Sequence, residues 1–440
     1  MNFRPLILRS TFWVKDYFNG SAVGRHYRDI RTIMEDGMKG ELLRQQHIKS
    51  ILRHVTKHSP FYKQFASADL SEFPVVNKVI LRENYNAIKI PVSNIPGQIG
   101  EVFIQRTSGS TGTPMAVPQN SIKRNRRVAE LKYFGKQSGF KSHEKLIHLR
   151  TWNRWQSKTK RQAASENIIP FNITNLGEST LGELCNIIAR DKPLAIRGYA
   201  SSVDLLVRYA VANNLRFPSL KIIIAISETL HEATRELVLE HLKCDIISQY
   251  SNEENGILGQ EMVGETGNRV FYLNHASYFF EVLKMDEDVP AEYGQLGRIV
   301  VTDYFNFAFP MIRYDTGDTG ILRESDKYSN GYPVLEGLFG RRIDMVFDTR
   351  GNAIHPMAIA RILKHYPEIY QWQFIQREKN VYSLKVVLFD GMRLNDNIKI
   401  ELIKLFGENA AMEVELTNEI AVLSSGKRKS VMNEWKELAF

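Results

Sequence analysis

The stretch from Ser179 to Gln249 constrains the fold most, because helical and strand-like patterns alternate along it. Its centre is Ile222–Ile226, I-I-I-A-I, a continuous apolar run suited to a parallel strand that is buried on both faces. Shorter strand-like runs lie at Leu194–Arg197 and Asp245–Ser248, with helical patterns between them. This alternation predicts an α/β sheet with right-handed crossovers, whose ligands bind beyond the carboxyl ends of the strands.

Changes of pattern divide the chain into a large and a small domain. Residues 1–95 have mostly helical periodicity, and a long helix with a basic face is expected at Ser121–Ser138. Short strands follow from Arg269 to Arg323, with turn residues between them at Arg313–Gly320. We expect an α/β fold with a large N-terminal domain of mixed sheets and helices (residues 1–343), joined by a hinge to a small α+β domain (residues 344–440).

The composition is that of a globular chain with a basic excess. Of the 440 residues, 43% are hydrophobic and 24% are charged, and the formal net charge is +9. This charge favours anionic ligands such as nucleotides or lipid head groups. The two cysteines, Cys185 and Cys244, lack metal-ligand spacing, and no apolar run is long enough to span a membrane. We therefore expect a protein of the reducing cytoplasm.

Two segments mix aromatic and basic residues. Residues Phe3–Phe18 either dock on the protein, which we favour, or touch a membrane surface, so peripheral membrane association is an alternative. Residues Thr151–Ala164 carry two tryptophans among basic residues, a composition shared with single-strand nucleic-acid grooves. Because no nucleic-acid module surrounds this segment, we interpret it as a surface loop near a charged ligand and expect no nucleic-acid partner.

The Ser/Thr/Gly loop at Thr107–Pro114, T-S-G-S-T-G-T-P, is a candidate anion site. Glycines let the backbone approach a ligand closely, and successive N–H groups in such a turn can hold phosphate oxygens. Strand-like residues on both sides, Glu101–Gln105 and Met115–Val117, place the loop in a hairpin. This differs from a Walker loop, which leads into a helix. Taken alone, the sequence is also typical of a flexible turn.

Four further polar segments follow this loop in order. They are Y-S-N-E-E at Tyr250–Glu254, Y-D-T-G-D at Tyr314–Asp318, G-R-R-I-D at Gly340–Asp344 and the pair Gly426-Lys427. Each is weak alone, but the order and spacing of the series resemble the signature motifs of the adenylate-forming superfamily. The resemblance covers most of the chain and implies a large adenylate-forming domain followed by a small mobile domain.

Three other stretches are similar to the phenylacetate–CoA ligase branch and its CapK-like relatives from capsule loci: His58–Tyr62, Phe73–Lys78 and Arg197–Ser202. This branch implies an AMP-forming ligase that adenylates a carboxylic acid with ATP and releases pyrophosphate. The acyl group then passes to CoA or to another acceptor, an amine or a sugar, in polysaccharide or capsule biosynthesis. The implied cofactors are ATP and Mg²⁺, with CoA as one candidate acceptor.

The resemblance also implies roles for residues. The loop would cradle the β- and γ-phosphates through Thr107, Ser108, Gly109, Ser110, Thr111 and Gly112. Glu254 falls on the family's catalytic magnesium carboxylate, and Tyr250 would pack on the adenine. Ser227 and Glu228 would line the adenine pocket, mainly through their backbone. Asp318 would accept hydrogen bonds from both ribose hydroxyls, which suits a carboxylate.

Three further residues lie near or beyond the boundary between the two expected domains. Arg341 would reach the ribose or a phosphate, Asp344 would be the hinge, and the catalytic Lys427 would bridge the substrate carboxylate and the α-phosphate. The chain departs from the family at Glu253, where relatives often carry Ser or Thr, and at Thr113, where many carry Lys.

The sequence does not identify the acid, the acceptor or the oligomeric state. Candidates for the acyl pocket are His148, Trp152, Trp155 and Tyr199. Two alternative functions remain: transfer of AMP itself to a cofactor hydroxyl, and a non-catalytic nucleotide-binding scaffold in polysaccharide assembly.

Overall fold

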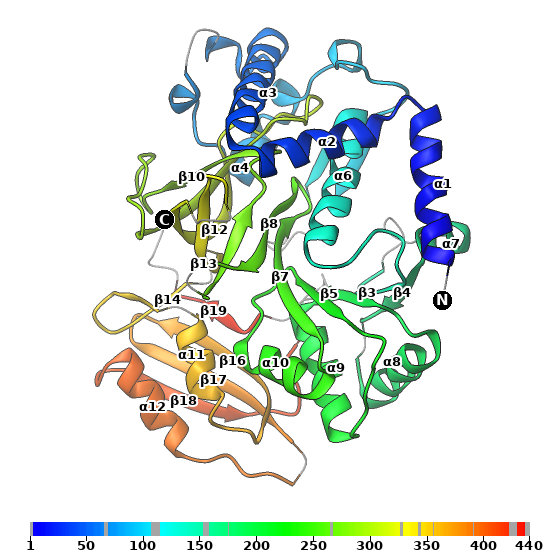
Figure 1. Ribbon diagram of the computed structural model, residues 1–440. Helices are drawn as coiled ribbons and strands as arrows, with labels where there is room; N and C mark the ends of the chain where they lie inside the picture. Colours follow the sequence, from blue (N-terminus) through cyan, green and yellow to red (C-terminus); the bar gives the residue numbers. More distant parts are fainter. Residues whose placement is uncertain are drawn as a thin grey trace.

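Figure 1 shows the computed structural model of the chain, in which a large domain stands above a small C-terminal domain. The structure describes residues 3–65, 69–106, 115–152, 158–174, 176–264, 267–325, 329–341, 345–354, 356–389, 391–421 and 429–435. Within these ranges, no helix is long and apolar enough to cross a membrane.

The N-terminal residues form helices, as predicted, and they pack beside the sheet of the large domain (Figure 1). The side chain of Asn77 caps α4 by accepting from the N–H groups of Val79 (2.9 Å) and Ile80 (3.0 Å). The elements are α1 (Arg4–Phe18), α2 (Ala22–Glu35), α3 (Gly37–His58), η1 (Lys63–Phe65), η2 (Leu70–Glu72), α4 (Lys78–Glu83), α5 (Tyr85–Ile88) and η3 (Val92–Asn94).

One half of the eleven-stranded sheet is parallel, in the order β7-β6-β5-β3-β4, and confirms the predicted alternation. All five residues of its central strand β6 are buried, because helices cover the sheet there. The strands are β3 (Leu146–Arg150), β4 (Ile168–Asn172), β5 (Ala195–Tyr199), β6 (Ile222–Ile226) and β7 (Asp245–Asn252). The helices between them are α7 (Lys160–Glu166), α8 (Glu178–Asp191), α9 (Ala200–Ala212) and α10 (Glu232–Leu237), which continues into a π turn η4 (Val238–Leu242).

The other half of the sheet is antiparallel and continues from β7 in the order β8-β9-β13-β12-β11-β10. Its strands are β8 (Gly256–Val263), β9 (Arg269–Leu273), β10 (Tyr278–Leu283), β11 (Leu296–Asp303), β12 (Tyr314–Ser325) and β13 (Pro333–Arg341). The expectation that Arg313–Gly320 forms a turn between strands is wrong, because β12 begins at Tyr314. Pairing with β11 and β13 on both sides overrides the local turn propensity, and register shifts accommodate the glycines.

The predicted hairpin around the Ser/Thr/Gly loop is present in its flanks. Strand β1 (Phe103–Arg106) pairs antiparallel with β2 (Ala116–Gln119), and Arg106 lies opposite Ala116. The loop residues 107–114 lie outside the described residues. After β2, α6 (Ser121–Gln137) forms the long helix expected at this position, and it packs against α2.

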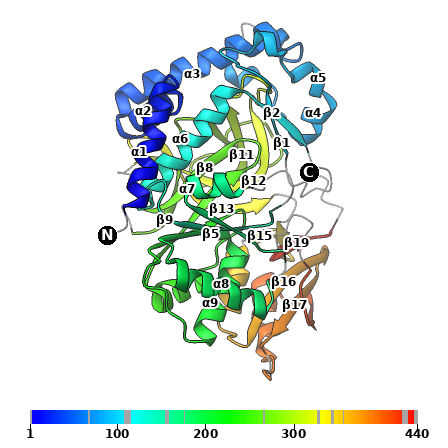
Figure 2. The same ribbon diagram turned by 90° about the vertical axis from the view of Figure 1, so that its right-hand side faces the viewer.

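The C-terminal domain has its own hydrophobic core and a four-stranded sheet in the order β18-β17-β16-β19. Its elements are β14 (Val346–Phe347), β15 (Ala353–Ile354), α11 (Pro356–Leu363), β16 (Ile369–Glu378), β17 (Val381–Leu388), α12 (Asn397–Phe406), β18 (Ala411–Leu416) and β19 (Val431–Asn433). This domain contacts the large domain near α10, where Lys364 Nζ lies 2.6 Å from Glu236 Oε1. In Figure 2 the C-terminal domain lies beside α8 and α9 and below the rest of the large domain.

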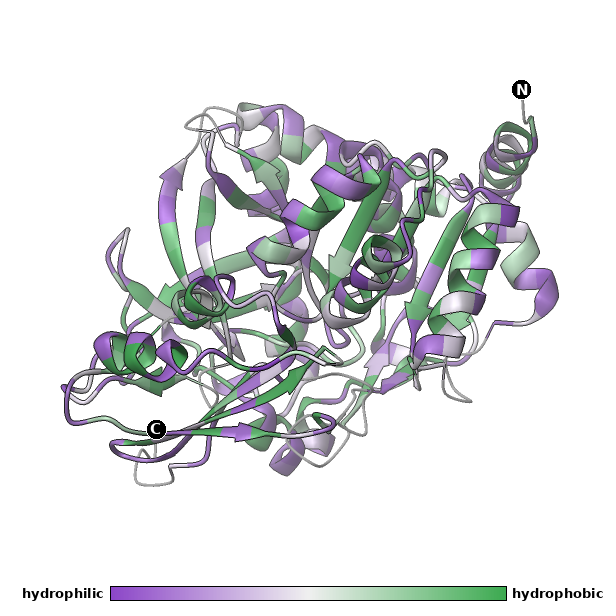
Figure 3. Ribbon diagram, turned by 90° about the horizontal axis from the view of Figure 1, so that it is seen from below, coloured by the Kyte–Doolittle hydropathy of each residue, from purple (hydrophilic) through white to green (hydrophobic). Residues whose placement is uncertain are grey.

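Apolar residues concentrate in the strands, whereas the surrounding helices carry both apolar and polar residues (Figure 3). The largest buried clusters lie separately in the two halves of the large domain. The polar side chains of the candidate active site lie at strand ends near the boundary between these two clusters.

Candidate active site

Tyr250 and Asp318 meet across the sheet, although 68 residues separate them in the sequence. The Tyr250 hydroxyl donates to Asp318 Oδ2 at 2.9 Å and lies 3.3 Å from Thr316 Oγ1. Burial, together with the nearby Asp318 carboxylate, raises the pKa of Tyr250 well above its usual value. Tyr250 is therefore a neutral donor that fixes the orientation of the Asp318 carboxylate.

Glu254 lies in the turn between β7 and β8, and its side chain is only 4% exposed. Its Oε1 atom is 2.6 Å from Lys78 Nζ and accepts from the Tyr314 hydroxyl at 3.1 Å. Burial by itself raises the pKa of Glu254, but Lys78 and Tyr314 outweigh burial, and the resulting pKa is below the usual value. Glu254 is thus a buried carboxylate that stays ionised.

Local structure places Lys78 at this carboxylate. Val76 forms a parallel bridge with Tyr314 of β12, through Val76 N–H to Arg313 O (3.0 Å) and Asp315 N–H to Val76 O (2.8 Å). Asn77 then caps α4, so that Lys78 is the first residue of the helix. Lys78 is the last residue of the stretch Phe73–Lys78, for which no role was predicted from the sequence. A lysine directly after a helix cap in that stretch was the available signal.

Ser227 and Glu228 follow β6 at the same edge of the sheet. Ser227 has a left-handed backbone (φ 67°), and Glu228 Oε2 accepts from the Ser201 N–H at 2.8 Å, at the start of α9. The Glu228 side chain is therefore engaged with α9. This leaves the backbone of the segment for the predicted adenine pocket, and that role stays a prediction.

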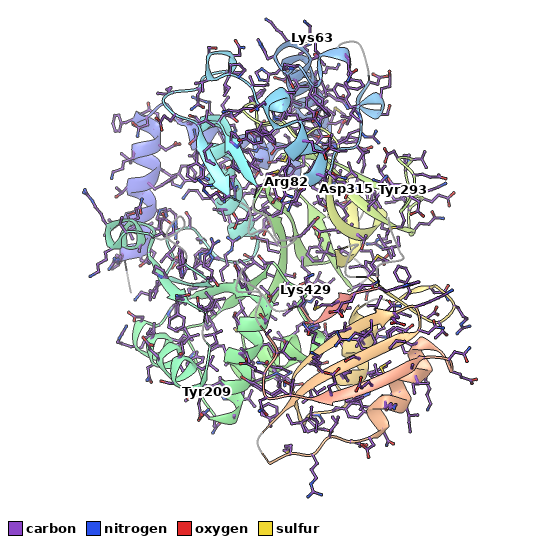
Figure 4. The ribbon with its side chains drawn as sticks, turned by 180° about the vertical axis from the view of Figure 1, so that it is seen from behind. Lys63, Arg82, Tyr209, Tyr293, Asp315 and Lys429 are labelled. Atoms are coloured by element: carbon purple, nitrogen blue, oxygen red, sulfur yellow. The ribbon has the colours of Figure 1, made fainter. Side chains whose placement is uncertain are left out.

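The other predicted residues are described in part or not at all. Arg341 lies opposite Asp318 in the β12–β13 pairing, but its side chain is outside the described part of the structure. Thr107–Gly112, Asp344 and Lys427 also lie outside the described residues, and their roles stay predictions. The chain is described again from Lys429, which Figure 4 labels between the two domains. The next residue, Ser430, has its hydroxyl 3.3 Å from His231 Nε2 in the segment between β6 and α10.

Basic side chains lie on the neighbouring strands β3 and β5. Arg150 is 3.3 Å from Glu253 Oε1, and Gln105 of the β1–β2 hairpin donates to Glu253 Oε2 at 2.7 Å. Arg197 donates to Gln249 Oε1 at 2.6 Å. The acyl-pocket candidates His148 and Trp152 contact each other, with ring centroids 5.3 Å apart, whereas Trp155 lies outside the described residues. Glu253 therefore contacts both the β1–β2 hairpin and β3, the strand that carries the acyl-pocket candidate His148.

The residues around Glu254 can be compared with the ligands that the predicted magnesium ion needs. Within the described ranges, no group of three His, Cys, Asp or Glu side chains could hold a metal ion by itself. Mg²⁺ that arrives with a nucleotide needs only one or two carboxylates besides the phosphates. An ionised, buried Glu254 therefore fits a magnesium ion of that kind, with the Lys78 ammonium as its competitor.

Comparison with known proteins agrees with this geometry. Residues 346–434 match the model of the CapK C-terminal domain. The chain is 22% identical over 435 residues to protein CapK of Staphylococcus aureus, covering 93% of each chain. It is also 22% identical over 418 residues to a phenylacetate–coenzyme A ligase of Thermus thermophilus, covering 89% of this chain and 87% of the relative.

Solved structures share the fold at 18% identity. A 2-hydroxyisobutyryl-CoA ligase in the postadenylation state, with 2-HIB-AMP, has a TM-score of 0.73 and covers 92% of this chain and 91% of its own. The same ligase in the thioesterification state, with 2-HIB-AMP and CoA, has a TM-score of 0.59 and covers 92% of each chain. The overall arrangement of this chain is therefore nearer to the postadenylation structure. Together, these comparisons show that the chain is similar to CapK and to a phenylacetate–CoA ligase over most of its length, and that it shares the fold of acyl-CoA ligases.

Proposed function

We propose that this protein is an AMP-forming ligase that activates a carboxylic acid. A carboxylate oxygen of the acid attacks the α-phosphorus of ATP, the bond to the β-phosphate bridging oxygen breaks, and acyl-AMP and pyrophosphate form. A nucleophile of the acceptor then attacks the acyl carbon, loses its proton, and releases AMP. CoA is the first candidate acceptor, because related ligases carry it in their names and in one solved complex.

The observation that carries the proposal is the convergence of Tyr250, Glu254 and Asp318 at one edge of the sheet. Asp318, held by Tyr250, supplies a fixed carboxylate for the two ribose hydroxyls. Mg²⁺ at Glu254 would neutralise charge on the phosphates when bound. The N–H groups of Thr107–Gly112 bind phosphate oxygens, and Lys427 approaches the α-phosphate from the small domain. Asp344 is the proposed hinge between residues 1–343 and 344–440.

The proposed setting is polysaccharide or capsule biosynthesis in the cytoplasm. CapK similarity over most of the chain supports this setting, as do the two buried free cysteines. An amine or hydroxyl of a sugar is the alternative acceptor to CoA.

Pyrophosphate release with a panel of carboxylic acids tests the activity, with Lys427→Ala as the inactive variant. We expect acid-dependent pyrophosphate release from the wild type and ATP binding without turnover from Lys427→Ala. Pyrophosphate release that depends on a hydroxyl cofactor, with AMP retained on the product, would instead identify AMP transfer. ATP binding with no turnover in the wild type, whatever the acid, would identify a scaffold.

We also propose that helix α1 rests on an anionic membrane surface. Its inner face is held by the protein, since Arg9 pairs with Glu144 at 2.9 Å and Lys132 Nζ lies 3.5 Å from the Phe12 ring centroid. Its outward face has large apolar side chains at helical spacing, each more than half exposed: Phe3, Leu6, Ile7, Val14, Tyr17 and Phe18. Figure 3 shows α1 at the outer edge of the molecule.

Basic residues beside α1 support an anionic surface as its partner. A pocket of about 440 Å³ lies beside α1. Besides Arg9 and Lys132, which already have partners in the protein, the basic residues Arg28, Lys136 and Lys141 contribute to its lining. Nearby acids are already engaged, because Asp16 accepts from the Val23 and Gly24 N–H groups (2.9 and 2.8 Å) and Glu144 pairs with Arg9. Basic residues beside an apolar helix face favour anionic head groups.

Sedimentation with phosphatidylglycerol and phosphatidylcholine vesicles tests this surface. We expect binding to the anionic vesicles that weakens with salt and is lost in Ile7→Ser/Phe18→Ser. Ile400→Ser, which changes an exposed apolar residue on α12, is the control and should bind like the wild type. Equal binding by the double variant, or self-association of the wild type without vesicle binding, contradicts the proposal.

A further inference from the structure

The strand ends of β3 and β5 present basic side chains on one face of the sheet. His148 pairs directly with Arg197 in the parallel register. Because side chains alternate along a strand, Arg150 lies on the same face as His148, and Tyr199 on the same face as Arg197. Gln249, which accepts from Arg197, joins them from β7. Five polar side chains from three strands therefore face the same region, next to Glu253.

The charges of this group are not balanced by the protein. Arg127 of α6 donates to the Glu253 carbonyl at 2.9 Å, and Arg150 pairs with the Glu253 carboxylate. Arg197 has a neutral partner, Gln249. Three guanidinium groups thus surround one carboxylate. Burial, followed by repulsion from Arg150 and Arg127, lowers the pKa of Arg197 to about 10.

Hydrogen-bonding atoms of the same group also lack partners. Among the described residues, the buried atoms Arg150 Nε, Thr151 Oγ1, Arg197 Nε and His148 Nε2 have no hydrogen-bond partner. Buried polar atoms without partners are uncommon and costly, and several in one place indicate that a ligand completes them. A purely apolar acyl group would supply neither the missing acceptors nor the missing negative charge.

We propose that the acid activated by this protein carries a second anionic group, a carboxylate or a phosphate, which binds between Arg150 and Arg197. This inference rests on the proposed function, because it assigns the group to the acid and not to ATP or CoA. The first carboxylate reacts near Glu254, while the second is held by guanidinium groups, whose planar donors match an anion bidentately.

Matched acids of similar size test the proposal by pyrophosphate release: succinate against butyrate, and phthalate against benzoate. We expect kcat/KM to favour the dianionic member of each pair about 10- to 100-fold, the range for one or more charge-assisted hydrogen bonds. In Arg197→Gln this preference should fall by about 10-fold. Arg190→Gln, which changes an exposed arginine paired with Asp191, is the matched control and should retain the wild-type ratio.

Three outcomes separate the explanations. Arg197→Gln could raise KM for ATP or CoA and leave the acid preference unchanged. That result would show that a phosphate of ATP or CoA binds at the arginines, and it would overturn the proposal. Equal use of both members of each pair also overturns it. If no acid releases pyrophosphate, the proposed function fails. In that case, calorimetric binding of succinate that is lost in Arg197→Gln still supports the anion site, and its absence refutes it. Circular dichroism of each variant excludes misfolding as the cause.

Discussion

The β12 side and the β5 side of the candidate active site differ in how their charges are satisfied. At Glu254, Lys78 and Tyr314 already supply a countercharge and a donor, and at Asp318 the Tyr250 hydroxyl does the same work of orientation. At Arg197, the protein supplies one neutral acceptor and further positive charge. The first side is therefore organised before any ligand binds, whereas the second is completed by a ligand.

This difference has a consequence for stability. Removing one partner of a buried, paired charge leaves the other unpaired and destabilises the fold, whereas removing a buried charge that lacks a counterion relieves a cost. The two sides of the site should therefore respond to substitution with opposite signs.

Lys78→Met should have the largest effect, because it leaves the Glu254 carboxylate buried without its cation. We expect the free energy of unfolding in urea, without nucleotide, to fall by about 3–5 kcal/mol, the range for breaking a buried pair. Glu254→Gln in the same chain should restore part of this loss. Lys89→Met, at an exposed position 11 residues further on, should change it by less than about 0.5 kcal/mol. A Lys78→Met variant as stable as the wild type would show that the pair is not coupled to folding.

Asp318→Ala should weaken ATP binding about 100-fold, since hydrogen bonds to a charged group contribute about 1.5–3 kcal/mol and the ribose offers two hydroxyls. The loss also leaves the buried Tyr250 hydroxyl without its carboxylate acceptor. Isothermal calorimetry with ATP and Mg²⁺ measures the change, with Asp286→Ala, an exposed acid between β10 and β11, as the control. Unchanged affinity would remove Asp318 from the nucleotide site.

The sequence predicts much of the β12 side of the site but little of the β5 side. Ile222–Ile226 predicts its own strand because five apolar residues in a row need burial on both faces. Tyr250, Glu254 and Asp318 were predicted from motif order; in the structure Tyr250 contacts Asp318, and Glu254 contacts Tyr314 of the same strand β12. Arg313–Gly320 was misread as a turn, because its turn-forming residues are held in a strand by pairing with both neighbouring strands, β11 and β13.

The other side depends on register, which the sequence does not display. His148 and Arg197 are 49 residues apart and become neighbours only because β3 and β5 pair in one parallel register. The partner of Glu254 was missed for a similar reason. Lys78 reaches it through the bridge between Val76 and Tyr314, a contact between residues 238 positions apart. Long-range pairing therefore decides what local motifs cannot.

Tyr314→Phe separates the two partners of Glu254 and should cost less than the loss of Lys78. It removes one hydroxyl donor to a buried carboxylate, so we expect the free energy of unfolding to fall by about 1–2 kcal/mol. Tyr293→Phe, at a half-exposed tyrosine labelled in Figure 4, is the control and should be neutral. A cost as large as that of Lys78→Met would mean that the hydroxyl, and not the ammonium, holds Glu254 in place.

Arg197→Met should have the smallest effect on stability and the opposite sign. It removes a buried cation that repels Arg150 and Arg127, while losing one hydrogen bond to Gln249, so we expect the ligand-free protein to gain up to about 1 kcal/mol. Urea unfolding with and without succinate measures this. The dianion should stabilise the wild type but not the variant, because the variant lacks the Arg197 cation that binds it. If Arg197→Met instead destabilises the ligand-free protein as Lys78→Met does, the arginine belongs to the fold, and the two sides of the site do not differ as proposed.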